Sequence, residues 1–178
     1  IYLGHGNGWP STHAPFDVKS KDGMGLNRTA GSGNSNTKYF GEYYMAKLAL
    51  AENAVVVLNR LCYASGNSEW GSANPTKATA IKRVDNYGAG FLRTGAKVVF
   101  AEAINSVSHQ VRSLFTTNYS KNTILMTHPS ASSARDFYFT SSRTYWAKAH
   151  LDPPQSGKYW RAAIGNLSLT AAQWRAGG

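Results

Sequence analysis

Apolar residues form short continuous runs and longer segments of helical periodicity along the first two thirds of the chain. Residues 54–58 are a mainly β-branched run, as expected for a central strand covered on both faces, and residues 97–101 repeat this pattern. Apolar positions at helical spacing predict helices over 39–52, 76–94 and 106–119. Strands that alternate with helices indicate right-handed crossovers and a parallel sheet.

The N-terminal segment predicts one more strand, then a turn and a long loop. Residues 1–3 are apolar, and the sequence Gly4-His5-Gly6-Asn7-Gly8 that follows allows positive φ angles and close backbone approach. Residues 10–37 are interrupted by Pro, Gly, Ser and Asn, which favours a binding loop next to a site over a linker. Since neither an initiator Met nor a signal peptide opens the sequence, we expect a mature or trimmed piece of a longer precursor.

The pattern changes in the last third of the chain. Residues 137–140 and 146–150 alternate as strands do, and two prolines then end the regular pattern. The sequence therefore predicts an α/β domain over residues 1–150, a three-layer sandwich with a mainly parallel sheet. Residues 151–178 are expected to form a C-terminal tail or a join to a following module.

Length and charge narrow the function classes. The 178 residues suit one domain, and no run approaches the roughly 18 apolar residues of a membrane helix, so no membrane span is expected. With 19 Lys and Arg against 9 Asp and Glu, the net charge is +10. This positive charge suits an anionic partner such as a cell-wall polymer. Alternatively, the basic residues are spread over the surface and serve solubility. Scattered aromatics and the lack of long like-charge blocks argue against nucleic-acid binding.

Cysteine usage suggests the compartment and one candidate group. A single cysteine, Cys62, excludes an internal disulfide and a zinc site built from several cysteines. The histidines have no metal-ligand spacing, so no metal and no other cofactor is expected. Few cysteines and a surface rich in Gly, Ser, Thr, Asn and Tyr resemble bacterial exported proteins, which predicts a secreted or cell-surface protein. Cys62 is then either a nucleophile or a buried small hydrophobic residue.

Three chemically active residues follow predicted strands. His5, Cys62 and Glu102 would lie at the same edge, because an open α/β sheet places its ligands beyond the carboxyl ends of its strands. A cysteine nucleophile needs a base and a proton donor for the leaving group, and histidine suits both roles. The backbone N–H of Gly6, unobstructed by a Cβ, could bind the oxyanion together with that of Cys62. The sequence predicts a His5/Cys62 pair.

Other residues near this edge admit two interpretations each. Glu102 could line a substrate pocket or orient His5, or it could be a solvated loop carboxylate. Trp9, beside the histidine turn, and Trp70, after the cysteine loop, could wall a substrate pocket or anchor a core.

The segments around the pair resemble a known group of enzymes. The residues concerned are Ile1-Tyr2-Leu3-Gly4-His5-Gly6 and Val55-Val56-Val57-Leu58-Asn59-Arg60-Leu61-Cys62, with a helix-Gly-Ala-strand sequence over 91–99. They look like the caspase/gingipain/clostripain group of cysteine peptidases and its CHAT-related subgroup, in which a His-Gly strand end precedes a strand ending in Cys. The resemblance covers roughly residues 1–105. It implies a caspase-like fold, with His5 as proton donor, Cys62 as nucleophile and Gly6 at the oxyanion.

The expected function is therefore that of an extracellular cysteine endopeptidase, a hydrolase acting on peptide or protein substrates through an acyl-enzyme. The alternative is a non-catalytic surface, adhesion or assembly-forming module of the same fold, with Cys62 inert. An exposed sheet edge at the N-terminal strand would favour self-association.

Overall fold

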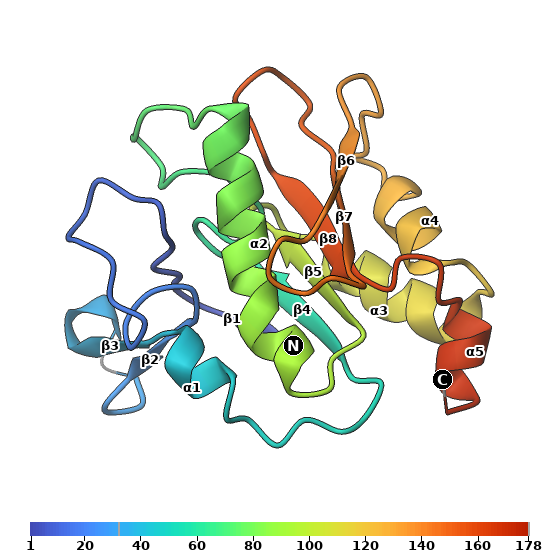
Figure 1. Ribbon diagram of the computed structural model, residues 1–178, viewed down its shortest axis with the longest axis horizontal. Coiled ribbons are helices and arrows are strands. Elements are labelled where there is room, and N and C mark those ends of the chain that lie inside the picture. Colours follow the sequence, from blue (N-terminus) through green and yellow to red (C-terminus); the bar gives the residue numbers. More distant parts are fainter. Residues whose placement is uncertain (32, 178) are drawn as a thin grey trace.

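A six-stranded mixed sheet forms the centre of the molecule, as seen in a computed structural model that describes residues 1–31 and 33–177 (Figure 1). Its strands, in spatial order, are β1 (Tyr2–Leu3), β4 (Val55–Asn59), β5 (Val98–Glu102), β8 (Arg161–Gly165), β7 (Lys148–Leu151) and β6 (Phe137–Thr140). Strands β1, β4 and β5 run parallel, whereas β5, β8, β7 and β6 pair antiparallel.

The α/β class is confirmed, but the prediction of a mainly parallel sheet holds only for the half of the sheet that contains β1, β4 and β5. Parallel neighbours need a crossover of a dozen or more residues. Residues 141–147 between β6 and β7, and residues 152–160 between β7 and β8, are too short for such a crossover, so these strands return as antiparallel neighbours.

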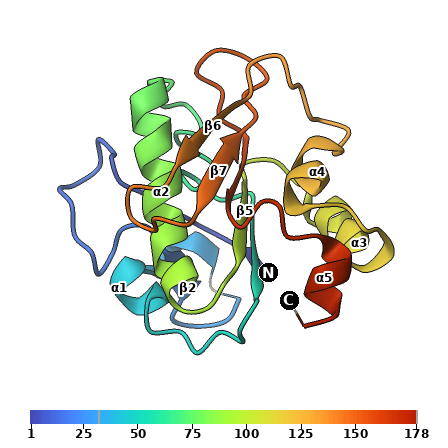
Figure 2. The same cartoon turned by 45° about the vertical axis from the view of Figure 1, so that its right-hand side comes forward.

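Helices cover both faces of the sheet (Figure 2). On one face, α2 (Lys77–Arg93) packs over alternate strand residues such as Val56 and Leu58. On the other, Val57 faces the core shared with α3 (Val107–Thr116), α4 (Lys121–Met126) and α5 (Ala171–Arg175). This alternation follows from the period of two in a strand, and it explains why β4 and β5 read as continuous apolar runs.

The helices predicted over 76–94 and 106–119 are confirmed as α2 and α3. Thr76 caps α2 by accepting a hydrogen bond from the backbone N of Thr79 at 3.1 Å. Gly95, with φ of +109°, follows the end of the helix in a backbone conformation that glycine adopts readily.

The helix predicted over 39–52 is wrong for most of its length. Its first residues belong to β3 (Thr37–Phe40), which pairs with β2 (Met24–Asn27) in a hairpin beside the β1 edge, after a short 3-10 turn, η1 (Gly33–Asn36). Only α1 (Glu42–Met45) is helical. Gly41 separates the two because its N–H donates to the Lys19 carbonyl at 2.7 Å, a tertiary contact that overrides the helical periodicity.

The C-terminal stretch is part of the sheet and not a tail. Strand β8 lies inside residues 151–178 and is inserted between β5 and β7, with all five of its residues buried. The prediction failed here because Arg161, Ala162 and Ala163 lack the β-branched pattern that marks β4 and β5.

Candidate functional site

The parallel pairing of β1 with β4 brings the His-Gly turn beside the cysteine. The register aligns Tyr2 with Leu58 and Leu3 with Asn59. Four residues further on, Gly6 lies against Cys62: a Cβ on Gly6 would overlap the Cys62 carbonyl oxygen and would lie 2.6 Å from the Tyr87 hydroxyl. The two strand ends are therefore in van der Waals contact at their carboxyl edge.

The backbone of the His5 turn is fixed by the β2–β3 hairpin. The N–H of Gly25 donates to the His5 carbonyl at 2.8 Å, and the Tyr2 hydroxyl donates to the same oxygen at 3.0 Å. The Tyr2 hydroxyl also lies 2.6 Å from the carbonyl oxygen of Gly25. His5 is an exposed residue, and these contacts hold its main chain.

Cys62 lies in a tightly bent segment. Arg60 and Tyr63, on either side of Leu61-Cys62, have φ angles of 56° and 69°. A non-glycine residue in this left-handed region costs conformational energy, and such strained residues concentrate at functional sites. The N–H of Leu61 donates to the Glu102 carbonyl at 3.1 Å, which anchors the bend to the end of β5.

Burial raises the pKa of the half-buried Cys62 thiol, and the nearby negative charge of Glu69 raises it further. Glu69 pairs with His13, whose Nε2 lies 3.3 Å from its carboxylate. The resting thiol is therefore protonated at neutral pH, and any reaction at sulfur requires a base to remove its proton.

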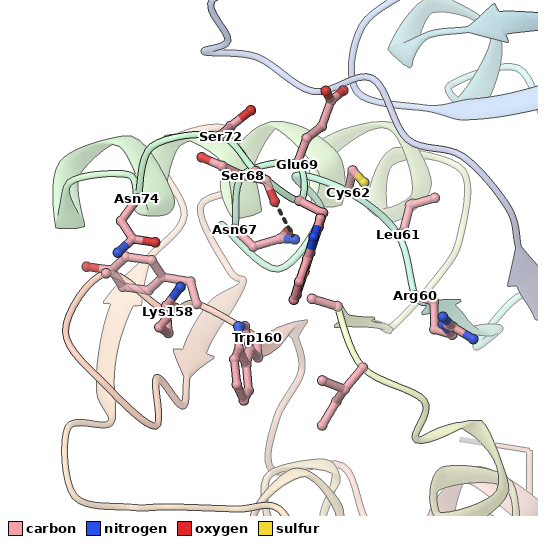
Figure 3. Close-up of a pocket in the computed structure, with 16 residues that line it drawn as sticks. Arg60, Leu61, Cys62, Asn67, Ser68, Glu69, Ser72, Asn74, Lys158 and Trp160 are labelled. Carbon is pink, nitrogen blue, oxygen red and sulfur yellow. Dashed lines mark hydrogen bonds between the residues drawn. The ribbon is translucent and has the colours of Figure 1, made fainter.

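A cavity of about 520 Å³ opens beside Cys62 (Figure 3). Three segments build it: the loop after β4, the loop after β5 and the loop before β8. It therefore adjoins the carboxyl ends of two parallel strands, where open α/β sheets bind ligands. Its lining residues are Arg60, Leu61, Cys62, Asn67, Ser68, Glu69, Trp70, Gly71, Ser72, Asn74, Ala103, Ile104, Gly157, Lys158, Tyr159 and Trp160.

Glu102 is placed in the interior and not in the cavity wall. Its carboxylate lies 3.1 Å from Nε of Arg161 and accepts from the Gln110 side chain. Burial raises the pKa of Glu102 to about 7, while Arg161 opposes the rise. Within the described part of the chain, its neighbours Ala103 and Ile104 reach the cavity instead.

The two tryptophans have different environments. Trp70 lines the cavity and is fully exposed. Trp9 is half-buried in the loop beside α2. Its backbone N–H donates to Asp22 Oδ1 at 2.8 Å, and its backbone carbonyl accepts from the Asn86 side chain at 2.9 Å. Its ring packs against Phe16, with centroids 5.8 Å apart. Trp9 anchors a loop, and Trp70 forms a wall.

Sequence reasoning missed two buried charged residues that support the histidine turn. Lys21 is buried, and its Nζ donates to Asn7 Oδ1 at 2.8 Å, Ser11 Oγ at 3.0 Å and the His13 carbonyl at 2.7 Å. Asp22 is fully buried, and its Oδ2 has no hydrogen-bond partner among the described residues. Burial raises its pKa to about 7. Both residues lie in the stretch 10–37, which the sequence predicts only as a loop.

Trp160 and Lys158 were missed because they lie in the stretch expected to be a tail. Among residues 1–31 and 33–177, no group of three or more His, Cys, Asp or Glu could hold a metal ion. None of the described helices is both long and apolar enough to cross a membrane.

The fold and the site together define an α/β protein with a half-buried thiol beside a cavity at the carboxyl edge of its parallel strands. No protein-family model matches the sequence, and no curated protein or solved structure matches it significantly.

Proposed function

We propose that this protein is an extracellular cysteine endopeptidase of caspase-like type, with Cys62 as nucleophile and His5 as proton carrier. The observation that supports it best is the contact between Gly6 and Cys62 at the ends of neighbouring parallel strands. This contact joins a His-Gly turn, a thiol and a cavity at one edge of the sheet, where a peptide could reach all three.

The reaction would proceed by acyl transfer. The Cys62 thiol loses its proton to His5 as sulfur attacks the scissile carbonyl carbon, and the carbonyl oxygen becomes an oxyanion near the backbone N–H of Gly6. The C–N bond then breaks, and His5 returns the proton to the departing amine. Water hydrolyses the thioester, releases the new carboxylic acid and restores the thiol.

The raised thiol pKa sets a condition on this mechanism. Burial and Glu69 both disfavour a resting thiolate, so sulfur must become nucleophilic only when a substrate is in place. His5, an exposed residue on a turn with a fixed backbone, suits that requirement, because an imidazole acts as a base and, once protonated, as a proton donor.

The same pKa favours a second candidate function. A protonated thiol suits a non-catalytic surface or assembly module in which Cys62 only packs. Its basic surface, with a net charge of +10, would then bind an anionic wall polymer. In this alternative the cavity binds a ligand without cleaving it.

The test is digestion of a denatured protein mixture by the wild-type chain and by Cys62→Ala and His5→Ala, with new peptide termini read by mass spectrometry. The proposal expects termini that depend on both residues. Termini that persist in Cys62→Ala reveal a contaminating peptidase, and no termini from the wild type favours the binding module. Folding of each variant is checked by circular dichroism.

A further inference from the structure

We infer that the cavity beside Cys62 binds a large apolar side chain, aromatic by preference, from an extended peptide. We assign this side chain to the peptide residue whose carbonyl is attacked, and that assignment rests on the proposed peptidase function. The binding preference itself rests on the walls, charges and supports of the cavity.

Two tryptophans supply the apolar walls. The Trp70 indole is fully exposed, and Trp160 from the opposite loop keeps 38% of its surface exposed. Ile104, in the loop after β5, adds aliphatic surface. An aromatic ring that stacks or packs edge-on against an indole gains more than burial alone provides, so these walls select a ring or a long aliphatic chain.

The charges around the cavity disfavour a basic side chain. The Glu69 carboxylate is paired with His13, and Figure 3 shows it directed away from Trp160 and Lys158. Arg60 and Lys158 contribute two positive charges to the lining. A lysine or arginine side chain entering the cavity at this end would approach these like charges, while the Glu69 carboxylate is engaged by His13 and points away.

The loops that form the walls are held together before any ligand arrives. The Ser65 hydroxyl donates to the Tyr159 carbonyl at 2.7 Å, and this contact is buried. Gly157, with φ of +76°, packs so closely on Asn74 that a Cβ would lie 2.8 Å from the Asn74 Cβ. These two contacts join the loop after β4 to the loop before β8, and the volume of about 520 Å³ between them falls in the range of ligand sites.

Binding can be measured without catalysis in Cys62→Ala. The probes are blocked tripeptides, acetyl-Ala-Ala-Xaa-amide, with Phe, Leu, Lys, Asp or Gly as Xaa, and the readout is the shift of the Trp70 and Trp160 indole N–H signals in nitrogen-15 NMR spectra. These signals are assigned from Trp70→Phe and Trp160→Phe. We expect the Phe peptide to bind at least tenfold more tightly than the Lys or Gly peptide. Trp70→Ala should weaken it about three- to tenfold, and Tyr145→Ala, which removes an exposed aromatic outside the cavity, should leave it unchanged.

Cleavage of the same sequences by the wild-type chain separates the two proposals. Preferred binding of Phe without Cys62-dependent cleavage would overturn the peptidase and keep the cavity assignment. Cleavage and binding that favour Lys or Gly would keep the peptidase and overturn the cavity assignment. Shifts of both indoles by chitin oligosaccharides but by none of the peptides would also overturn it, in favour of a glycan site.

Discussion

The Cα of Gly6 packs against the carbonyl oxygen of Cys62 so closely that only hydrogen fits as the side chain at position 6. Backbone of the cysteine bend and the buried Tyr87 ring bound this space, and neither can move as a flexible surface side chain would. Position 6 therefore determines how the histidine turn and the cysteine bend sit against each other.

Gly6→Ala is expected to separate the two strand ends. Forcing a methyl group into this packed contact should lower the free energy of unfolding by about 1–3 kcal/mol and should speed the labelling of Cys62 by Ellman's reagent. Gly31→Ala is the control for backbone strain without overlap, because φ is +76° there and a Cβ meets no atom within 4 Å, and it should leave the labelling rate unchanged. Equal labelling rates in both variants would contradict the packing argument.

Glu69→Gln should make the Cys62 thiol more acidic. The carboxylate disfavours the thiolate, so its neutralisation lowers the thiol pKa towards the usual range, although burial still keeps it raised. Alkylation by iodoacetamide at pH 8 should quicken about two- to fivefold, and the rate profile should move to lower pH. Glu52→Gln, an exposed carboxylate outside this cavity, should not move the profile. An unchanged profile in Glu69→Gln would exclude a direct electrostatic effect on sulfur.

Asp22 is expected to make the protein less stable as pH rises. Its pKa is about 7 when folded against 3.8 as the ordinary value, so the folded state keeps a proton that the unfolded chain releases. Stability from this group is full below about pH 4 and is lost through pH 7. Between pH 5 and pH 8 the loss should be about 2–3 kcal/mol.

Asp22→Asn should remove this part of the pH dependence. Asparagine tolerates the left-handed backbone at this position, where φ is 62°, and its side-chain oxygen can still accept from the backbone N–H of Trp9. Glu102 titrates in the same range in both proteins, so the difference between their urea-unfolding curves at pH 5 and pH 8 isolates Asp22. Identical pH slopes would show that Asp22 is ionised in the folded protein throughout this range.

Arg161→Leu should be strongly destabilising. The guanidinium lies 3.1 Å from Glu102 and 3.2 Å from Asp152, and all three side chains are buried. Its removal leaves two buried carboxylates without their cation, at a cost of about 3–5 kcal/mol. Arg112→Leu at an exposed position of α3 should change the free energy of unfolding by less than about 0.5 kcal/mol. Similar urea midpoints for both variants would contradict this role of Arg161.

The parallel half of the fold could be predicted because its sequence signals are local. The β-branched runs at 54–58 and 97–101 and the periodic segments at 76–94 and 106–119 became β4, β5, α2 and α3. The placement of His5 and Cys62 at one edge followed from strand order alone, since parallel neighbours share their carboxyl edge.

The remaining elements depend on partners that are distant in sequence. Arg161 is tolerated inside β8 only because Glu102 and Asp152 surround it, and no local pattern signals that network. Trp160, which lines the cavity, directly precedes β8, so the failure to predict this strand also hid Trp160 as a cavity residue. The sequence predicts loop and helix where the hairpin that fixes His5 lies. The pairing of residues 37–40 with residues 24–27 outweighs the helical periodicity of residues 39–52.

The proposed function requires His5 to activate Cys62 at a site that peptides can reach. Intact mass spectrometry at pH 7, under native conditions, measures the labelling of Cys62 by a peptidyl acyloxymethyl ketone and by iodoacetamide in wild type and His5→Ala. We expect one adduct, on Cys62, which the peptidyl reagent forms faster than iodoacetamide does when each rate is scaled to that of free cysteine. In His5→Ala the peptidyl rate should fall by at least about a hundredfold. Labelling that requires denaturation, or a native rate unaffected by loss of His5, would contradict the account and would leave Cys62 as a packing residue.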